Sequence, residues 1–253
     1  MRELALRHPR YGYRRIAALL RAEGFKVNEK RVHRLWRKEG LKVPQKQHKK
    51  RRLVLGTSAN SIVRKCATRP NEVWSFDFCN DRTADGKALK IFSVIDEFTR
   101  RCLKIEVKHR FSGVDVVSVL KKLIRLHGVP EHVRSDNGPE FVCEALCAWA
   151  ARSKIGTLYI APGSPWENGI VESYHARLRD ELLDREEFAS LSQAKVLLEI
   201  WRQEYNEERP HGALGYMTPA AFAESCRGAG TGFAALSPCQ HRDEEELMES
   251  VAR

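Results

Sequence analysis

The chain has 253 residues, of which 42% are hydrophobic and 30% charged, the composition of a globular protein with a sizeable core. It has no run of about 18 apolar residues and no apolar signal segment at its start, so we expect a cytoplasmic protein without a membrane partner. Its seven cysteines are scattered and form no CxxC pair, which predicts reduced thiols rather than disulfides or zinc ligands.

The formal net charge of +11 is concentrated at the N-terminus. Residues 1–70 hold 21 Lys and Arg against 4 Asp and Glu, while the remainder holds 23 against 29. A basic segment joined to a mildly acidic body indicates a polyanionic partner. Nucleic acid fits better than a membrane surface, because the basic segment has no long apolar face to bury in lipid.

Two helices are predicted in the basic segment, over residues 13–23 and 28–39. Gly24 suits the position after the end of the first helix, and Asn28 suits the N-cap of the second. The second helix has an apolar stripe of Val32, Leu35 and Trp36 and a basic stripe of Arg31, Arg34 and Lys38. Residues 1–41 therefore resemble a helix-turn-helix DNA-binding arm, although a solvated basic hairpin of helices would show the same pattern.

A basic linker is predicted over residues 42–70. Its segment KVPQKQHKKRR has six Lys and Arg in eleven residues and no apolar pattern after Val43. Such a segment binds along phosphates with little dependence on base sequence. We expect Lys49, Lys50, Arg51 and Arg52 to contact DNA in this way.

The body, residues 71–188, is predicted to be an α/β domain. Residues 73–78 alternate between two sets of side chains. One set is Val73, Ser75 and Asp77, and the other is Trp74, Phe76 and Phe78, which indicates a strand with two different faces. The predicted order is three strands, then helix, strand, helix, strand and helix, over residues 71–81, 89–96, 101–107, 113–128, 131–136, 140–152, 157–160 and 168–183. An antiparallel group followed by alternating elements predicts a mixed five-stranded sheet with flanking helices.

Three acids are placed where they can converge. Asp77 lies in the first strand, Asp136 lies at the carboxyl end of the fourth, and Glu172 lies on the polar face of the last helix with Asn168, His175 and Arg179. Converging carboxylates repel one another unless cations neutralise them, and oxygen ligands suit Mg²⁺ or Mn²⁺. Two such ions, about 3.5–4 Å apart, support phosphodiester chemistry.

Each acid also has a plain structural explanation. Asp77 would pair with an arginine, Asp136 would make the turn with Asn137, Gly138 and Pro139, and Glu172 would be a solvated helix residue. We expect the turn to hold the strand end open while the Asp136 carboxylate binds metal.

Several motifs together resemble a known family. The stretches WSFDF, SVIDEFTRRCL, HGVPEHVRSDNGPEF, PGSPWENGIVES, RLRDELL and YNEERPHGALGYMTPAAF, with 35 residues between Asp136 and Glu172, are similar to the catalytic frame (OrfB type) of IS-three-family insertion sequences. That frame belongs to the retroviral-integrase-like transposases with an Asp-Asp-Glu triad. The resemblance covers about residues 8–223. Relatives often have Phe and Asn or Ser where this chain reads ESYHAR.

The resemblance implies an RNase H-like core and metal-dependent DNA strand cleavage and joining by Asp77, Asp136 and Glu172. The implied partners are double-stranded DNA (terminal inverted repeats and target), further copies of the chain bound to that DNA, and an upstream-frame protein or its fusion. It also implies a bacterial, nucleoid-associated location and a DNA contact at Arg179. We expect Asn137, Asn168 and His175 to contact DNA as well. No zinc is expected, because His8 and His33 have no cysteines nearby.

Two other functions remain open from the sequence: a DNA-binding regulator without catalysis and a structure-selective nuclease on the same fold. Residues 189–224 are predicted to form a helical extension, with Arg209 and His211 as DNA contacts. The Gly-, Ala- and acid-rich residues 225–253 are predicted to be a disordered tail.

Overall fold

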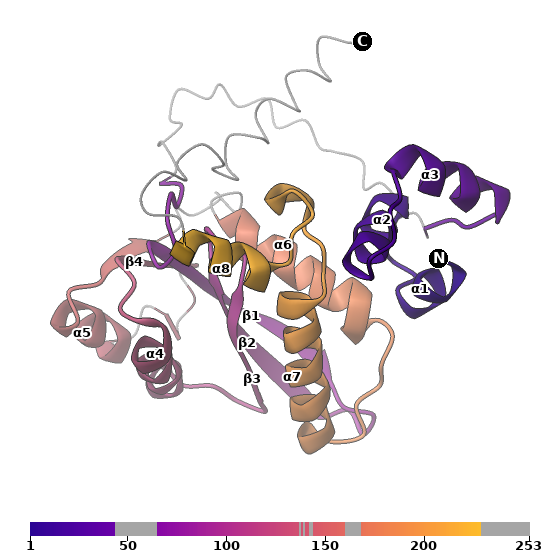
Figure 1. Cartoon of the computed structure of the whole chain (residues 1–253). Coiled ribbons are helices and arrows are strands. Elements are labelled where there is room, and N and C mark those ends of the chain that lie inside the picture. The colour runs from indigo at the N-terminus through magenta and orange to yellow at the C-terminus, as the bar shows by residue number, and fades with distance from the viewer. Residues whose placement is uncertain (44–64, 137, 139, 142–143, 160–167, 229–253) are drawn as a thin grey trace, which may run out of the picture.

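The structure is a computed structural model, and it describes residues 1–43, 65–136, 138, 140–141, 144–159 and 168–228 (Figure 1). Within these ranges no helix is both long enough and apolar enough to cross a membrane.

The centre of the molecule is a five-stranded mixed sheet in the order β3-β2-β1-β4-β5. The first three strands, β1 (Val73–Arg82), β2 (Ala88–Asp96) and β3 (Cys102–Lys108), are antiparallel neighbours. On the other side of β1, β4 (His132–Ser135) and β5 (Gly156–Tyr159) run parallel to it. The predicted mixed sheet is confirmed.

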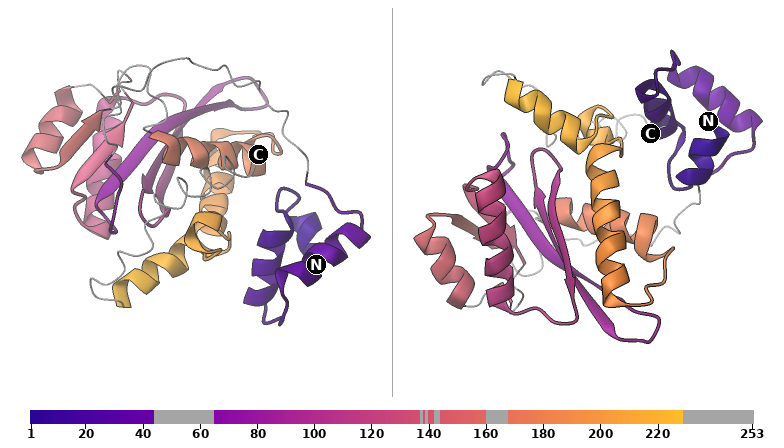
Figure 2. Two further views of the ribbon diagram at one scale, coloured as in Figure 1. Left: turned by 90° about the horizontal axis from the view of Figure 1, so that it is seen from above. Right: turned by 60° about the horizontal axis from the view of Figure 1, so that its bottom comes forward.

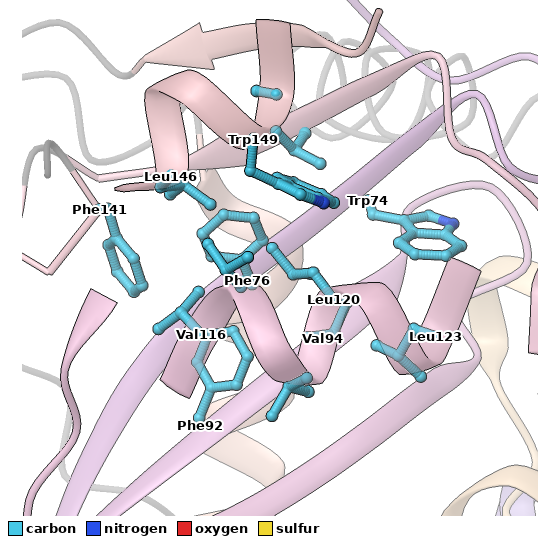
Figure 3. Close-up of a cluster of buried hydrophobic side chains, with 14 of the residues drawn as sticks. Trp74, Phe76, Phe92, Val94, Val116, Leu120, Leu123, Phe141, Leu146 and Trp149 are labelled. Carbon is cyan, nitrogen blue, oxygen red and sulfur yellow. The ribbon is translucent and has the colours of Figure 1, made fainter. Parts of the chain in front are cut away.

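Helices cover both faces of this sheet, on opposite sides in both views of Figure 2. On one face α4 (Gly113–His127) and α5 (Glu144–Arg152) enclose a core that includes Trp74, Phe76 and Phe92 (Figure 3). On the other face α6 (Gly169–Leu178), the π-helical turn η2 (Arg179–Leu183) and α7 (Leu191–Glu207) cover β2 and β3. The alternation in β1 follows from this arrangement, because its aromatic residues all face α4 and α5.

The N-terminal residues form a helical unit with its own core, built from α1 (Arg2–Arg7), α2 (Tyr13–Ala22) and α3 (Glu29–Lys38). As predicted, Asn28 caps α3: its Oδ1 accepts a 2.7 Å bond from the Arg31 backbone N–H. Gly24 has a φ of +88°, which favours glycine at that turn. Of the predicted apolar stripe on α3, Val32 and Trp36 are buried in this core, whereas Leu35 is 37% exposed and does not belong to it.

The N-terminal unit contacts the C-terminal extension. The Arg209 guanidinium lies 5.7 Å from the Tyr11 ring centroid, and Arg7 pairs with Glu208. Beyond α7 come the short η3 (Gly212–Leu214) and α8 (Pro219–Gly228). Because Phe222 packs in a core cluster with Phe98 and Leu214, α8 continues past residue 224, where the predicted tail begins.

One expectation from the sequence is corrected by a long-range contact. Cys66 is disulfide-bonded, so the prediction of reduced thiols is wrong there, because sequence spacing does not reveal which sulfur atoms the fold brings together. The buried carboxylate of Asp96 accepts backbone N–H bonds from Asn71, Phe98 and Thr99, and so closes the turn after β2.

Candidate active site at the carboxyl end of β4

Asp77 and Asp136 lie on adjacent parallel strands. Ser75 pairs with Arg134, so the same register continued for two residues places Asp77 beside Asp136, on the same face of the sheet. Neighbouring strands are about 4.8 Å apart, a separation that brings two carboxylates into strong electrostatic contact.

The turn after β4 holds the Asp136 side chain. Its Oδ1 accepts a 3.0 Å bond from the Gly138 backbone N–H, while its surface stays exposed. A Cβ at Gly138 would stand 3.1 Å from that oxygen, so the turn leaves little room for a larger residue. Asp136 therefore makes the turn and keeps a free face toward solvent.

Glu172 projects from the first turn of α6 and is exposed. The rotation of α6 is fixed by its buried face, where the Tyr174 hydroxyl donates to Cys102 Sγ at 3.0 Å. Tyr174 also packs edge-on against Trp201 and Tyr205 of α7. The apolar face of α6 and η2, formed by Val171, Tyr174, Leu178 and Leu182, is buried in one cluster.

The three acids share one electrostatic environment. The pKa of Asp77 is raised from 3.8 to about 7, first by burial and then by the negative charges of Asp136 and Glu172, against a hydrogen bond from the Phe78 N–H. Even so, within the described part of the chain no three His, Cys, Asp or Glu residues lie close enough together to hold a metal ion. The donor set itself, three carboxylates, fits Mg²⁺ or Mn²⁺.

His175 lies against Asp77, with its Nδ1 3.7 Å from Asp77 Oδ2. Burial, followed by the charge of Arg179, lowers the pKa of His175 to about 4, so the imidazole is neutral at pH 7 and the contact is no ion pair. Its Nε2 is buried and has no hydrogen-bond partner among the described residues. The His175 side chain is only 12% exposed, and it covers one side of the Asp77 carboxylate.

The other predicted DNA contacts on this helix differ in exposure. Arg179 is exposed and donates to Cys79 Sγ at 3.3 Å and to the Asn80 carbonyl at 3.4 Å. With His175 and Asp180 it lines an open depression next to Asp77. Asn168 is instead buried, and its Oδ1 has no hydrogen-bond partner in the part of the chain that the structure describes. Only Arg179 presents a charge that an approaching phosphate would meet.

The basic residues predicted on α3 lie on the separate N-terminal unit (Figure 1). Arg31, Arg34 and Lys38 are exposed, and so are Lys30 and Arg37, which the predicted stripe did not include. The remaining predicted contacts, Asn137, Lys49, Lys50, Arg51 and Arg52, lie outside the described residues.

Two buried ion pairs near the site had no signal in the sequence. Arg134 Nη1 donates to both carboxylate oxygens of Glu97 at 2.8 Å, two residues before Asp136. Arg209, predicted to contact DNA, is 3% exposed and donates to Glu181 through Nε and Nη2. The prediction that Arg209 contacts DNA is wrong, because this guanidinium is buried and paired with Glu181. His211 beside it is largely buried as well, packed edge-on against Tyr205.

Three family models match long segments of the chain. Two models, each described as an integrase core domain, match residues 67–165 and 153–219, and an HTH-like domain model matches residues 1–50. The chain is 39% identical over 225 residues to an uncharacterized 31.7 kDa protein of insertion element IS407 from Burkholderia multivorans, covering 89% of this chain and 79% of that protein.

Two further relatives are similar over comparable lengths. An uncharacterized 39.2 kDa protein of insertion element IS476 from Xanthomonas euvesicatoria is 40% identical, and this chain spans 64% of it, less than two thirds. The transposase InsD for insertion element IS2D of Escherichia coli is 29% identical over 87% of this chain and 76% of that protein.

Among solved structures, a chain of the simian T-cell lymphotropic virus intasome in complex with PP2A regulatory subunit B56 gamma is similar, with a TM-score of 0.54. Its sequence identity is 18%, and the match covers 63% of this chain and 56% of that chain. The likeness is one of fold, and it confirms the RNase H-like core expected from the sequence.

Proposed function

The chain belongs to the insertion-sequence transposases with a retroviral-integrase-like core, and from that membership we propose that it cleaves and joins DNA strands at the ends of an insertion sequence. One observation supports this most directly: Asp136 and Glu172 both raise the pKa of Asp77, so three acids from distant parts of the chain act on one another.

In this proposal Asp77, Asp136 and Glu172 hold the divalent cations, Mg²⁺ or Mn²⁺, and two ions are expected. When bound, such ions neutralise charge on the phosphodiester and on the attacking and leaving oxygens. The chain supplies the rest by position. The Gly138 N–H orients the Asp136 carboxylate, and the packing of Tyr174 orients Glu172.

The neighbouring residues have supporting roles in the proposal. His175 closes one side of Asp77 to water, because it is neutral and mostly buried. Arg179, exposed beside the acids, binds a DNA phosphate and so places the strand over them. Positioning and charge stabilisation of this kind carry most of phosphoryl-transfer catalysis.

DNA affinity is assigned to the N-terminal part. The exposed Arg31, Arg34 and Lys38 on α3 would enter a major groove of the terminal inverted repeats, while residues 42–70 follow the DNA backbone.

We further propose that copies of the chain pair the two element ends and the target DNA, with the upstream-frame protein or its fusion as a further partner. The proposed units are residues 1–41, 42–70, 71–188, 189–224 and 225–253, with α8 joining the last two.

The test uses a labelled duplex that ends in the terminal repeats of the flanking element, with Mg²⁺ or Mn²⁺. Glu172→Gln should lower joined products to less than about one hundredth, since even the loss of a residue that only supports a metal ligand costs about 10–100-fold. The matched control is Glu144→Gln, because Glu144 is also an exposed acid in the first turn of a helix. That variant should join DNA like the wild type.

The other outcomes separate the alternatives. Nicked products without joining would favour a structure-selective nuclease. Binding without any product, even after the upstream-frame protein is added, would favour a regulator without catalysis.

A further inference from the structure

An open groove of about 570 Å³ lies between α4 and α5, on the face of the sheet opposite α6 and α7 (Figure 2). Its apolar part is formed by Val117, Ile124 and Trp149. Val114, which also lines the groove, is 68% exposed. An apolar groove that is open to solvent offers a surface on which another segment can pack.

The charges around the groove all have one sign. Lys121 and Arg125 on α4 and Arg152 on α5 line it, and the described lining includes no Asp or Glu. An apolar floor with a basic rim is complementary to an acidic amphipathic segment.

The chain itself contains such a segment near its C-terminus, outside the described residues. The stretch DEEELMESV, residues 243–251, holds five acids, and Leu247, Met248 and Val251 at i, i+1 and i+4 share one face of a helix.

The described chain ends close to the groove. Helix α8 ends at Gly228, and the charge of its Arg227 acts on His127, the last residue of α4, where burial, Arg101, Arg202 and Arg227 all lower the histidine pKa. Ile124 and Arg125 belong to the same end of α4. The residues between Gly228 and Leu247 would span on the order of 60 Å when extended, whereas α4 is roughly 22 Å long. The reach is therefore sufficient.

We propose that the acidic C-terminal segment, residues 243–251, docks in the α4–α5 groove of its own chain. Leu247, Met248 and Val251 cover Val117 and Trp149, while the acids meet Lys121, Arg125 and Arg152. The contact neutralises a basic surface away from the catalytic acids. It follows from the fold and the charges alone, so it does not depend on the proposed catalytic function.

Zero-length carbodiimide cross-linking of the full chain tests the contact, because it joins a lysine to a carboxylate only when they touch. An equal mixture of ¹⁵N-labelled and unlabelled chain separates links within one chain from links between two. We expect Lys121 joined to acids of residues 243–249, with both peptides carrying the same isotope. Mixed-isotope links would show that a second copy fills the groove, and absence of any link would also overturn the proposal.

Charge variants give a second readout. Arg125→Glu with Arg152→Glu should lower the link yield at least about fivefold, and adding Glu244→Arg with Glu245→Arg should restore it. Lys122→Glu is the matched control, because Lys122 is exposed on the same helix but does not line the groove. If the double variant instead loses DNA affinity with an unchanged link yield, the groove is a DNA surface and the proposal fails.

Hydrogen exchange on the full chain provides an independent check. The test compares the wild type with a triple variant that combines Glu244→Lys, Glu245→Lys and Glu246→Lys. Backbone amides of residues 117–125 should exchange faster in the triple variant, while the exchange of α7 amides should stay unchanged. Equal exchange in α4 would contradict docking.

Discussion

Arg134 and Glu97 form a buried ion pair in which one guanidinium nitrogen lies 2.8 Å from both carboxylate oxygens. Arg134 precedes Asp136 by two residues on β4, and Glu97 directly follows β2. Arg134 Nη2 also donates to the Lys65 carbonyl at 2.6 Å. The pair therefore joins the end of β4 to the turn after β2, and it holds in place the strand end that carries Asp136.

Breaking this pair should destabilise the protein strongly. Glu97→Gln leaves a buried guanidinium without its counter-charge, which costs about 3–5 kcal/mol of the free energy of unfolding. Urea denaturation measures the change. Glu224→Gln, which breaks the exposed pair with Arg227, is the control and should cost less than about 1 kcal/mol. Equal effects of the two substitutions would contradict the anchoring role of the buried pair.

Asp77→Asn should stabilise the metal-free protein at alkaline pH. The pKa of Asp77 is about 7 in the folded state against 3.8 for a free side chain. The folded state therefore retains a proton that the unfolded state has released, and stability falls as pH rises from about 4 to 7. Removal of the carboxylate abolishes this loss, so the variant should gain on the order of 1–3 kcal/mol at pH 8 relative to pH 5. Thermal melts in EDTA measure the gain, and the exposed Asp184→Asn should show none.

His175→Phe should remove a contribution of His175 to the pH dependence of stability that is opposite in sign to the contribution of Asp77. The pKa of His175 is lowered to about 4 in the folded state. Between pH 6.5 and pH 4 the imidazole is therefore protonated in the unfolded state but neutral in the folded state. His175 thus lowers the free energy of unfolding as pH falls through this range. In the wild type the slopes of Asp77 and His175 offset each other between pH 5 and 6.5. The Phe variant should therefore lose stability with rising pH more steeply than the wild type. Parallel stability–pH curves would contradict the neutral state of His175. Removing the Nε2 atom should cost little stability, because no described residue forms a hydrogen bond with it.

Gly138→Ala should impair strand transfer more than folding. The new Cβ would stand 3.1 Å from Asp136 Oδ1, so the carboxylate has to move by a few tenths of an ångström or more. We expect a loss of roughly tenfold in joined product, because small misplacements at a reacting centre are costly. The change in unfolding free energy should stay within about 1 kcal/mol. Gly212→Ala is the control, since no heavy atom lies within 4 Å of its Cβ position, and unchanged joining in Gly138→Ala would contradict the role of this turn.

Local patterns in the sequence predicted the features that depend on neighbours in the chain. The alternation around Phe76 set the two faces of β1, and Asn28 marked the start of α3. Features that depend on distant partners could not be predicted this way. The sequence around Asp96 does not show that its carboxylate accepts hydrogen bonds from the backbone amides of Asn71 and Thr99. The sequence around Arg209 likewise does not show that its guanidinium pairs with Glu181. Helix α1 has too short an apolar pattern to be recognised without the surface it packs on.

The strand order has a consequence for the timing of synthesis. Strands β1, β2 and β3 pair with their neighbours in the chain and can form early, but β4 must return to the free edge of β1, and α6 must follow before Glu172 reaches the two aspartates. A chain still on the ribosome therefore lacks at least one of the acids until most of it has emerged. Prematurely terminated chains that end before α6 would contain the helices proposed to bind DNA but would lack Glu172, the third proposed catalytic acid. If both proposals hold, such chains would compete with the complete protein for the same DNA.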